Sequence, residues 1–147
     1  MEIVIAIAAN IVVGLILLAL FAWYRSPGNA RLSGPDEALS IYRQHFPDAS
    51  GTVTVAADGL AALISLRPAP GVGLLQLHGK RWSSRELTPE DLRTIAVEGD
   101  VINISLLDFG WPRCSVRIAD PDSRADWVSR LNALAARSER SKVASHA

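Results

Sequence analysis

Histidine and cysteine most often carry catalysis or bind metals, and this chain has few of either. The three histidines, His45, His78 and His146, are far apart, and none has a Cys, Asp or Glu at the spacing of a metal site. The single cysteine, Cys114, alternates with apolar residues, which is typical of a small core residue and not of a nucleophile. No G-x-S-x-G or phosphate-loop motif occurs. We therefore predict no catalytic residues, no metal and no cofactor, and expect that the protein is not an enzyme.

Basic residues gather near one predicted hairpin. Lys80, Arg81 and Arg85 place three cations there, and His78 could add a fourth. Phosphate headgroups bind to such donor clusters, and a membrane anchor would hold the cluster near anionic lipid. The alternative is a solvated sheet edge, where charged side chains prevent pairing with foreign strands.

Large aromatic side chains are concentrated in the segment 108–113, which connects two predicted strands. Phe109 and Trp111 lie there beside Gly and Pro and are followed by Arg113. Either the aromatics fold back over the open end of a barrel, or together with Arg113 they form a protein-contact patch. We also expect that Asp108 can pair with Arg113 across this loop.

Small and polar residues recur every fourth position near the N-terminus. Ala6, Asn10 and Gly14 share one face of a predicted helix. Small residues allow two helices to approach closely, and an Asn amide can donate a hydrogen bond across the contact. The pattern indicates a helix–helix interface, unless the Asn is simply tolerated within the span.

The segment Ile3–Tyr24 contains 22 residues without a charge. At 1.5 Å per residue it reaches about 33 Å, enough for a hydrocarbon core of about 30 Å. A cleaved signal peptide would need a basic start, but only Met1 and Glu2 precede the apolar run. We therefore predict an uncleaved transmembrane helix over residues 3–24.

The residues that flank this helix indicate its orientation. Arg25 and Arg31 follow it, whereas Glu2 is the charged residue before it. The positive-inside rule then predicts an N-terminus outside and a cytoplasmic C-terminal domain in a bacterial inner (plasma) membrane. A linker is expected over 25–34.

The remainder is predicted to be mostly β-structure. Residues 35–50 form a short helix, over Pro35–Phe46, and a turn; the helix packs on the domain or on the membrane surface. After Gly51 the apolar period changes to two, and three hairpins follow. Their turns are Asp58-Gly59, Gly79-Lys80 and Gly99-Asp100, and their registers pair Val55 with Ala62, Val53 with Ile64, Leu77 with Trp82, Val97 with Ile102 and Ile95 with Ile104.

The C-terminal part completes the domain. The segment 88–91 is predicted as a capped helical turn, and 113–119 as a seventh strand. Asp120-Pro121 then begins a helix that buries Trp127, Val128, Leu131 and Leu134. We expect this helix to end near Arg137 and the tail 138–147 to be disordered.

Residues 51–137 resemble the pleckstrin-homology superfold through their element order and through an inward Trp127 on the last helix. The resemblance implies an α+β fold: a seven-stranded antiparallel, partly open barrel with a short preceding helix and a C-terminal capping helix. In lipid-binding members of that family a basic hairpin loop holds inositol headgroups. The anchor followed by a small sheet-rich module is also similar to bacterial single-pass inner-membrane proteins.

Charge balance narrows the range of partners. The chain has 15 Lys+Arg against 15 Asp+Glu, which disfavours nucleic-acid binding. We predict a non-catalytic interaction or accessory subunit that contacts the lipid bilayer and a membrane protein complex or a second copy of itself. The alternative is a module that binds or senses anionic lipid headgroups.

Overall fold

The computed structural model describes residues 1–25, 31–68 and 70–146. The chain divides into two units, 1–30 and 31–147, which are described separately. Half of the predicted linker 25–34, residues 26–30, lies outside the described residues.

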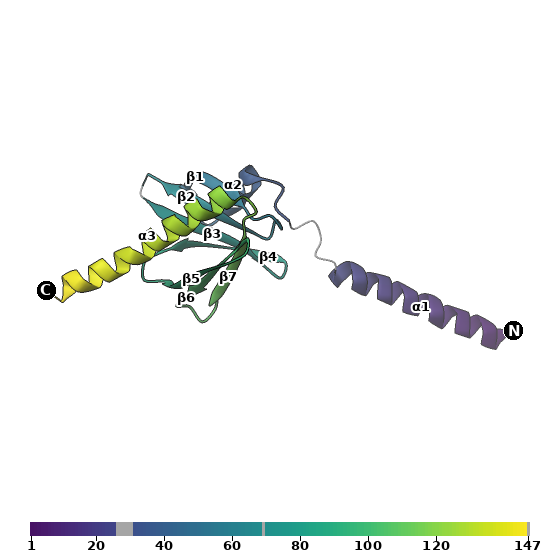
Figure 1. Ribbon diagram of the computed structural model, residues 1–147. Helices are drawn as coiled ribbons and strands as arrows, with labels where there is room; N and C mark the ends of the chain where they lie inside the picture. Colours follow the sequence, from purple (N-terminus) through teal and green to yellow (C-terminus); the bar gives the residue numbers. More distant parts are fainter. Residues whose placement is uncertain (26–30, 69, 147) are drawn as a thin grey trace. The chain divides into compact units, whose positions relative to one another are not determined.

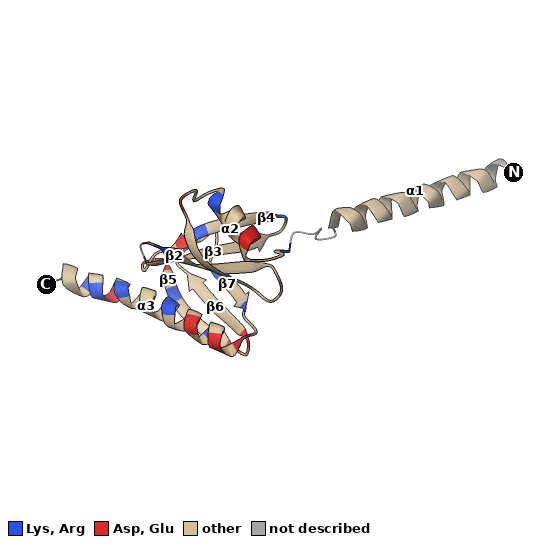
Figure 2. Cartoon of the chain, turned by 90° about the horizontal axis from the view of Figure 1, so that it is seen from above, with Lys and Arg blue, Asp and Glu red and all other residues tan. Residues whose placement is uncertain are grey.

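The first unit is the helix α1, Glu2–Arg25. Its segment Ile3–Tyr24 is long and apolar enough to cross a membrane, by length and composition. It is the one such helix among the residues described. In Figure 2 the helix is tan between its ends, the colour of residues other than Lys, Arg, Asp and Glu.

The second unit begins with residues that attach a short helix to the domain. Leu32 N–H donates to Gly59 O at 2.9 Å, and Ser33 N–H donates to Glu37 Oε2 at 2.7 Å. The helix α2, Pro35–Arg43, follows. It ends before Phe46, three residues earlier than predicted, because Gln44 and His45 donate to carbonyls three residues back and so tighten the last turn.

Seven antiparallel strands form two sheets (Figure 1). The first sheet has the order β1-β2-β3-β4 and the second has the order β5-β6-β7. Their bounds are β1 Ser50–Val55, β2 Ala61–Arg67, β3 Gly71–His78, β4 Arg81–Leu87, β5 Leu92–Glu98, β6 Val101–Leu106 and β7 Arg113–Arg117. The sheets are not closed into a barrel, which corrects that part of the expected architecture.

The predicted hairpin registers are confirmed. The paired residues are Val55 with Ala62, Val53 with Ile64, Leu77 with Trp82, Val97 with Ile102 and Ile95 with Ile104. Gly59, Gly79 and Gly99 adopt φ of 71°, 62° and 60°, which only glycine reaches without strain. The segment 88–91 is a hydrogen-bonded turn in which Asp91 N–H donates to Thr88 O.

The last helix, α3, spans Pro121–Ser145, and Asp120 Oδ2 caps it by accepting from Ser123 N–H at 2.9 Å. Trp127, Leu131 and Leu134 are buried, as predicted. The helix continues past Arg137 to Ser145, where a disordered tail was expected. Three long charged side chains and one alanine, which have high helix propensity, favour this extension: Glu139, Arg140, Lys142 and Ala144.

Both faces of the first sheet are covered. One face packs against the second sheet and α3, which crosses the strands in Figure 1, and forms a core that includes Leu63, Leu74 and Ile102. The other face packs against α2, where Ala38 and Leu75 are buried. The short helix therefore packs on the domain, which was one of its two predicted locations.

Candidate interaction site

Arg85 links the two sheets instead of lying at the tip of its hairpin. From β4 its Nη2 donates to Asp91 Oδ1 at 2.8 Å, and its Nη1 donates to Asp108 Oδ2. Asp91 belongs to the turn before β5, and Asp108 to the loop after β6. The Arg85 side chain is only 19% exposed. Arg85 was expected to contact headgroups together with Lys80 and Arg81; two carboxylates engage it here, and the headgroup contact stays a prediction.

The two carboxylates of this cluster have lowered pKa values. The hydrogen bond from Gly110 N–H and then the interaction with Arg85 lower the pKa of Asp108. Burial acts to raise the pKa of Asp91, but hydrogen bonds from Thr88 and the charge of Arg85 outweigh burial, so this pKa also lies below its ordinary value. Both groups are therefore ionised at neutral pH and hold Arg85 in place.

Trp111 closes one end of the domain. Its Nε1 donates to Gln76 Oε1 on β3 at 2.7 Å, and the ring of His78 meets it edge-on with centroids 4.7 Å apart. The Trp111 side chain is 9% exposed and belongs to the core between the sheets. For Trp111 the structure thus favours core closure over a contact patch, and His78 packs on this ring.

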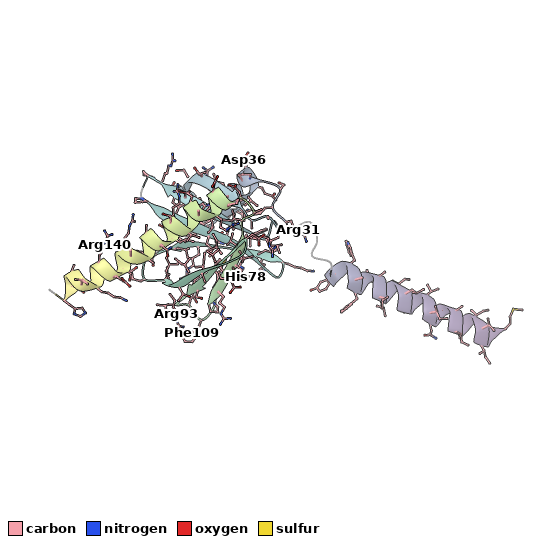
Figure 3. The ribbon with its side chains drawn as sticks, in the orientation of Figure 1. Arg31, Asp36, His78, Arg93, Phe109 and Arg140 are labelled. Carbon is pink, nitrogen blue, oxygen red and sulfur yellow. The ribbon has the colours of Figure 1, made fainter. Side chains whose placement is uncertain are left out.

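Phe109 has the opposite environment. It is fully exposed and points away from the domain (Figure 3), and Leu107 beside it is 64% exposed. Asp108 Oδ1 accepts from Gly110 N–H at 2.8 Å, which fixes the turn between them. We call residues 107–111 the Phe109 loop: Arg85 holds it through Asp108 at one side, and Trp111 anchors the other.

Arg113 forms no ion pair with Asp108, whose carboxylate is engaged by Arg85. Arg113 instead lines a shallow pocket of about 350 Å³ together with Arg93 of β5 and Ser105 of β6. The pairing of Thr94 with Ser105, and of Ser105 with Arg113, brings β5 and β7 residues to this place. The sequence interpretation missed Arg93, which only the register across three strands could have indicated.

Lys80 and Arg81 lie at the β3–β4 hairpin, and both are exposed. His78 pairs with Arg81 in the register but turns its ring to Trp111. Four residues were expected to supply cations at this hairpin. Lys80 and Arg81 lie at its tip, whereas His78 packs on Trp111 and Arg85 is engaged by two carboxylates.

On α1, the Asn10 Nδ2 group donates to Ala6 O at 2.9 Å within the same helix. This bond satisfies one amide donor of Asn10 without a partner helix. Gly14 has no atom within 4 Å of its would-be Cβ. The predicted helix–helix face formed by Ala6, Asn10 and Gly14 stays a prediction.

Among the described residues, no group of three or more His, Cys, Asp or Glu side chains could hold a metal ion. Cys114 is buried, and burial raises the pKa of its thiol to about 12, so the thiol is protonated at neutral pH. No family model, no curated protein and no solved structure matches this chain.

Proposed function

We propose that this protein is a single-pass, membrane-anchored, non-catalytic interaction or accessory subunit whose domain contacts a membrane protein complex. One observation carries the proposal: Phe109 is fully exposed although it lies two residues from the buried Trp111. A mobile loop could fold Phe109 back onto the domain, whereas this loop is fastened on both sides of it.

The contacts that hold the Phe109 loop in one conformation favour binding of a partner. Asp108 is engaged by Arg85 and Gly110, and Trp111 by Gln76. A loop held in one conformation loses little conformational entropy when a partner docks. Aromatic side chains and arginines carry a large share of interface energy. Arg113 comes two residues after this loop and lines a pocket together with Arg93. These features favour a protein contact centred on Phe109.

The pleckstrin-homology-like assignment belongs to this proposal. Four strands in one sheet, three in the next and a C-terminal helix with a buried Trp127 support it. Folds of this size host binding functions on varied loops, so the Phe109 loop, and not the fold, defines the contact.

The proposed location is a bacterial inner (plasma) membrane, with the N-terminus outside and the domain in the cytoplasm. Support comes from the apolar helix α1 and from Arg25 and Arg31, which follow the span. The partner is then a membrane protein or a second copy of this chain.

Co-purification tests the contact. The full chain is extracted in mild detergent with its partner, and Phe109→Ser is compared with Leu60→Ser, which removes another exposed apolar side chain from the β1–β2 hairpin. We expect the stoichiometric partner, or the second copy, to be lost with Phe109→Ser and retained with Leu60→Ser. Equal recovery with both variants would exclude Phe109 as the contact.

A second function is favoured by the β3–β4 hairpin. Exposed Lys80 and Arg81 are suited to contact anionic headgroups. Lys80→Ala with Arg81→Ala should then lower binding of the domain to phosphatidylglycerol vesicles at low salt, with Arg85 left intact to preserve its ion pairs. Unchanged vesicle binding would remove this function.

A further inference from the structure

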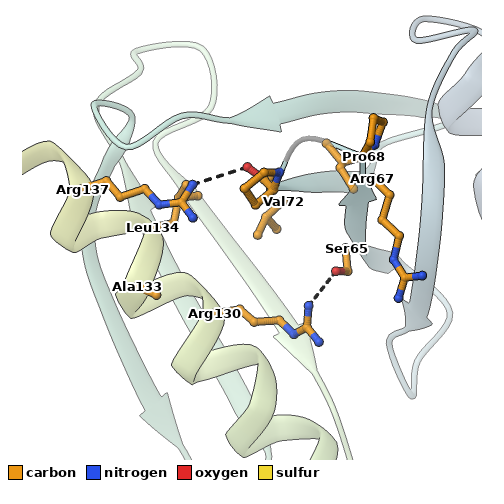
Figure 4. Close-up of a pocket in the computed structure, with 11 residues that line it drawn as sticks. Ser65, Arg67, Pro68, Val72, Arg130, Ala133, Leu134 and Arg137 are labelled. Atoms are coloured by element: carbon orange, nitrogen blue, oxygen red, sulfur yellow. Dashed lines mark hydrogen bonds between the residues drawn. The ribbon is translucent and has the colours of Figure 1, made fainter.

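A pocket of about 400 Å³ lies between α3 and the connection from β2 to β3 (Figure 4). Arginines reach it from two parts of the chain: Arg67 from the end of β2, and Arg130 and Arg137 from α3. None of the residues that line it belongs to the Phe109 loop or to the β3–β4 hairpin. The pocket is therefore separate from the surfaces discussed above.

The two α3 arginines face the same way. They are seven residues apart, which is about two helical turns, so both extend toward the β2–β3 connection in Figure 4. Arg130 Nη1 donates to Ser65 Oγ at 2.6 Å, and Arg137 Nη1 donates to Pro70 O at 3.5 Å. A guanidinium carries five N–H donors, so these bonds leave most donors of both side chains for a ligand.

The pocket has an excess of positive charge. No carboxylate lines it among the residues that the structure describes. Two carboxylates lie next to lining residues: Asp126 Oδ2 accepts from Arg130 Nε at 2.8 Å, and Glu86 Oε1 would lie 3.4 Å from a Cβ at Gly71. Three arginines against these two carboxylates leave one positive charge, which favours an anionic ligand such as a phosphate group. Along α3 as a whole, by contrast, both acidic and basic residues occur, as the red and blue segments of the helix in Figure 2 show.

The remaining wall is apolar and firmly held. Val72 and Leu134 are buried members of the core, and Pro68 and Pro70 line the pocket beside Leu66. A rigid apolar wall next to several fork-shaped donors can bind the organic part of a ligand while the arginines bind its anionic part.

We propose that this pocket binds a phosphate group, with Arg67, Arg130 and Arg137 donating to its oxygens and the apolar wall contacting the group that carries it. Planar guanidinium groups match phosphate oxygens in geometry as well as in charge. The phosphate belongs either to a soluble phosphorylated compound or to a lipid headgroup, because both present the same oxygens.

Pyrophosphate is the probe for this site. The full chain is placed in nanodiscs of phosphatidylcholine and titrated with pyrophosphate by calorimetry. We expect saturable binding that Arg67→Gln and Arg137→Gln each weaken about tenfold, the usual effect of losing one charged hydrogen-bond donor. Arg130 is left unchanged because its bond to Ser65 holds α3 to β2.

Arg140→Gln is the matched control. Arg140 is exposed on the same helix (Figure 3) and does not line the pocket. Its removal should leave the affinity unchanged, with thermal unfolding confirming that all three variants fold. No saturable binding to the native chain, or an equal loss with Arg140→Gln, would overturn the proposal.

A second titration identifies the source of the phosphate. Nanodiscs that contain phosphatidic acid are compared with those of phosphatidylcholine alone. If phosphatidic acid raises the apparent Kd of the native chain for pyrophosphate but does not raise that of Arg137→Gln, a headgroup occupies the site. An unchanged Kd would assign the site to a soluble phosphorylated compound.

Discussion

At the scale of single residues, Gly73 shows how a missing side chain positions a helix. The ring of Tyr42 from α2 lies directly on β3 at this glycine: a Cβ there would come within 2.9 Å of Tyr42 Cζ and Oη. Tyr42 is fully buried, and its hydroxyl donates to Arg85 O at 3.3 Å. The close approach lets α2 cover the outer face of the first sheet.

Gly73→Ala should therefore destabilise the domain by about 1–3 kcal/mol, because the buried Tyr42 ring must move. Tryptophan fluorescence during urea unfolding of the full chain in detergent measures the change. Gly71→Ala is the control: its Cβ would meet the flexible end of Glu86 at 3.4 Å and the Leu66 side chain at 3.5 Å, which are ordinary contacts, and we expect a change within about 0.5 kcal/mol. Equal effects of both substitutions would contradict the proposed role of the Tyr42–Gly73 contact.

At the scale of elements, the Arg85 cluster ties β4 to the turn before β5 and to the Phe109 loop. Its aspartates have lowered pKa values, so in the folded state they release their protons at lower pH than in the unfolded chain. The stability they contribute is complete above the unfolded value of 3.8 and is lost as the pH falls through the folded values.

We expect the free energy of unfolding to fall steeply below pH about 4, and Asp108→Asn to make this fall shallower because one titrating carboxyl is gone. Urea unfolding of the full chain in detergent across the acid range provides the test. Glu98→Gln, which removes an exposed carboxyl at the end of β5, should leave the slope unchanged. A slope unaffected by Asp108→Asn would show that the cluster does not govern acid stability.

Local signals were enough to predict the strands. Each hairpin turn contains a glycine at positive φ, and the alternation of apolar residues then specified the registers. The ion-pair partners of individual side chains were not predictable. The sequence suggested a bond between Asp108 and Arg113, whereas Asp108 pairs with Arg85, whose two carboxylate partners are 6 and 23 residues away from it. The length of α3 was underestimated, because the residues after Leu134 have helix propensity without an apolar stripe.

For the candidate sites too, local sequence signals were informative and contacts between distant residues were not predictable. The sequence drew attention to Phe109 and Trp111 but could not separate them, since the contacts that bury Trp111, with Gln76, His78 and the core, come from distant parts of the chain. It gave no indication of the arginine pocket. Arg67 and Arg130 are 63 positions apart in the chain and come near each other only through the packing of α3 beside β2.

At the scale of the whole molecule, the zero net charge conceals an uncharged span, Ile3–Tyr24, and a domain with both signs of charge. The proposed orientation depends on Arg25 and Arg31. A fluorescent protein fused to the C-terminus should be bright in bacteria, whereas alkaline phosphatase at the same position should be inactive, because it folds only after export. The reverse pair of results would place the domain outside and contradict the proposed orientation.

The most direct test of the proposed function places a photo-crosslinking amino acid at position 109 of the full chain in its native membrane. Because Phe109 is fully exposed and its loop is fastened at Asp108 and Trp111, we predict one discrete protein adduct on illumination. The same probe at Leu60 should give no such adduct. If position 109 yields no protein adduct above that background, the protein does not bind its partner through the Phe109 loop.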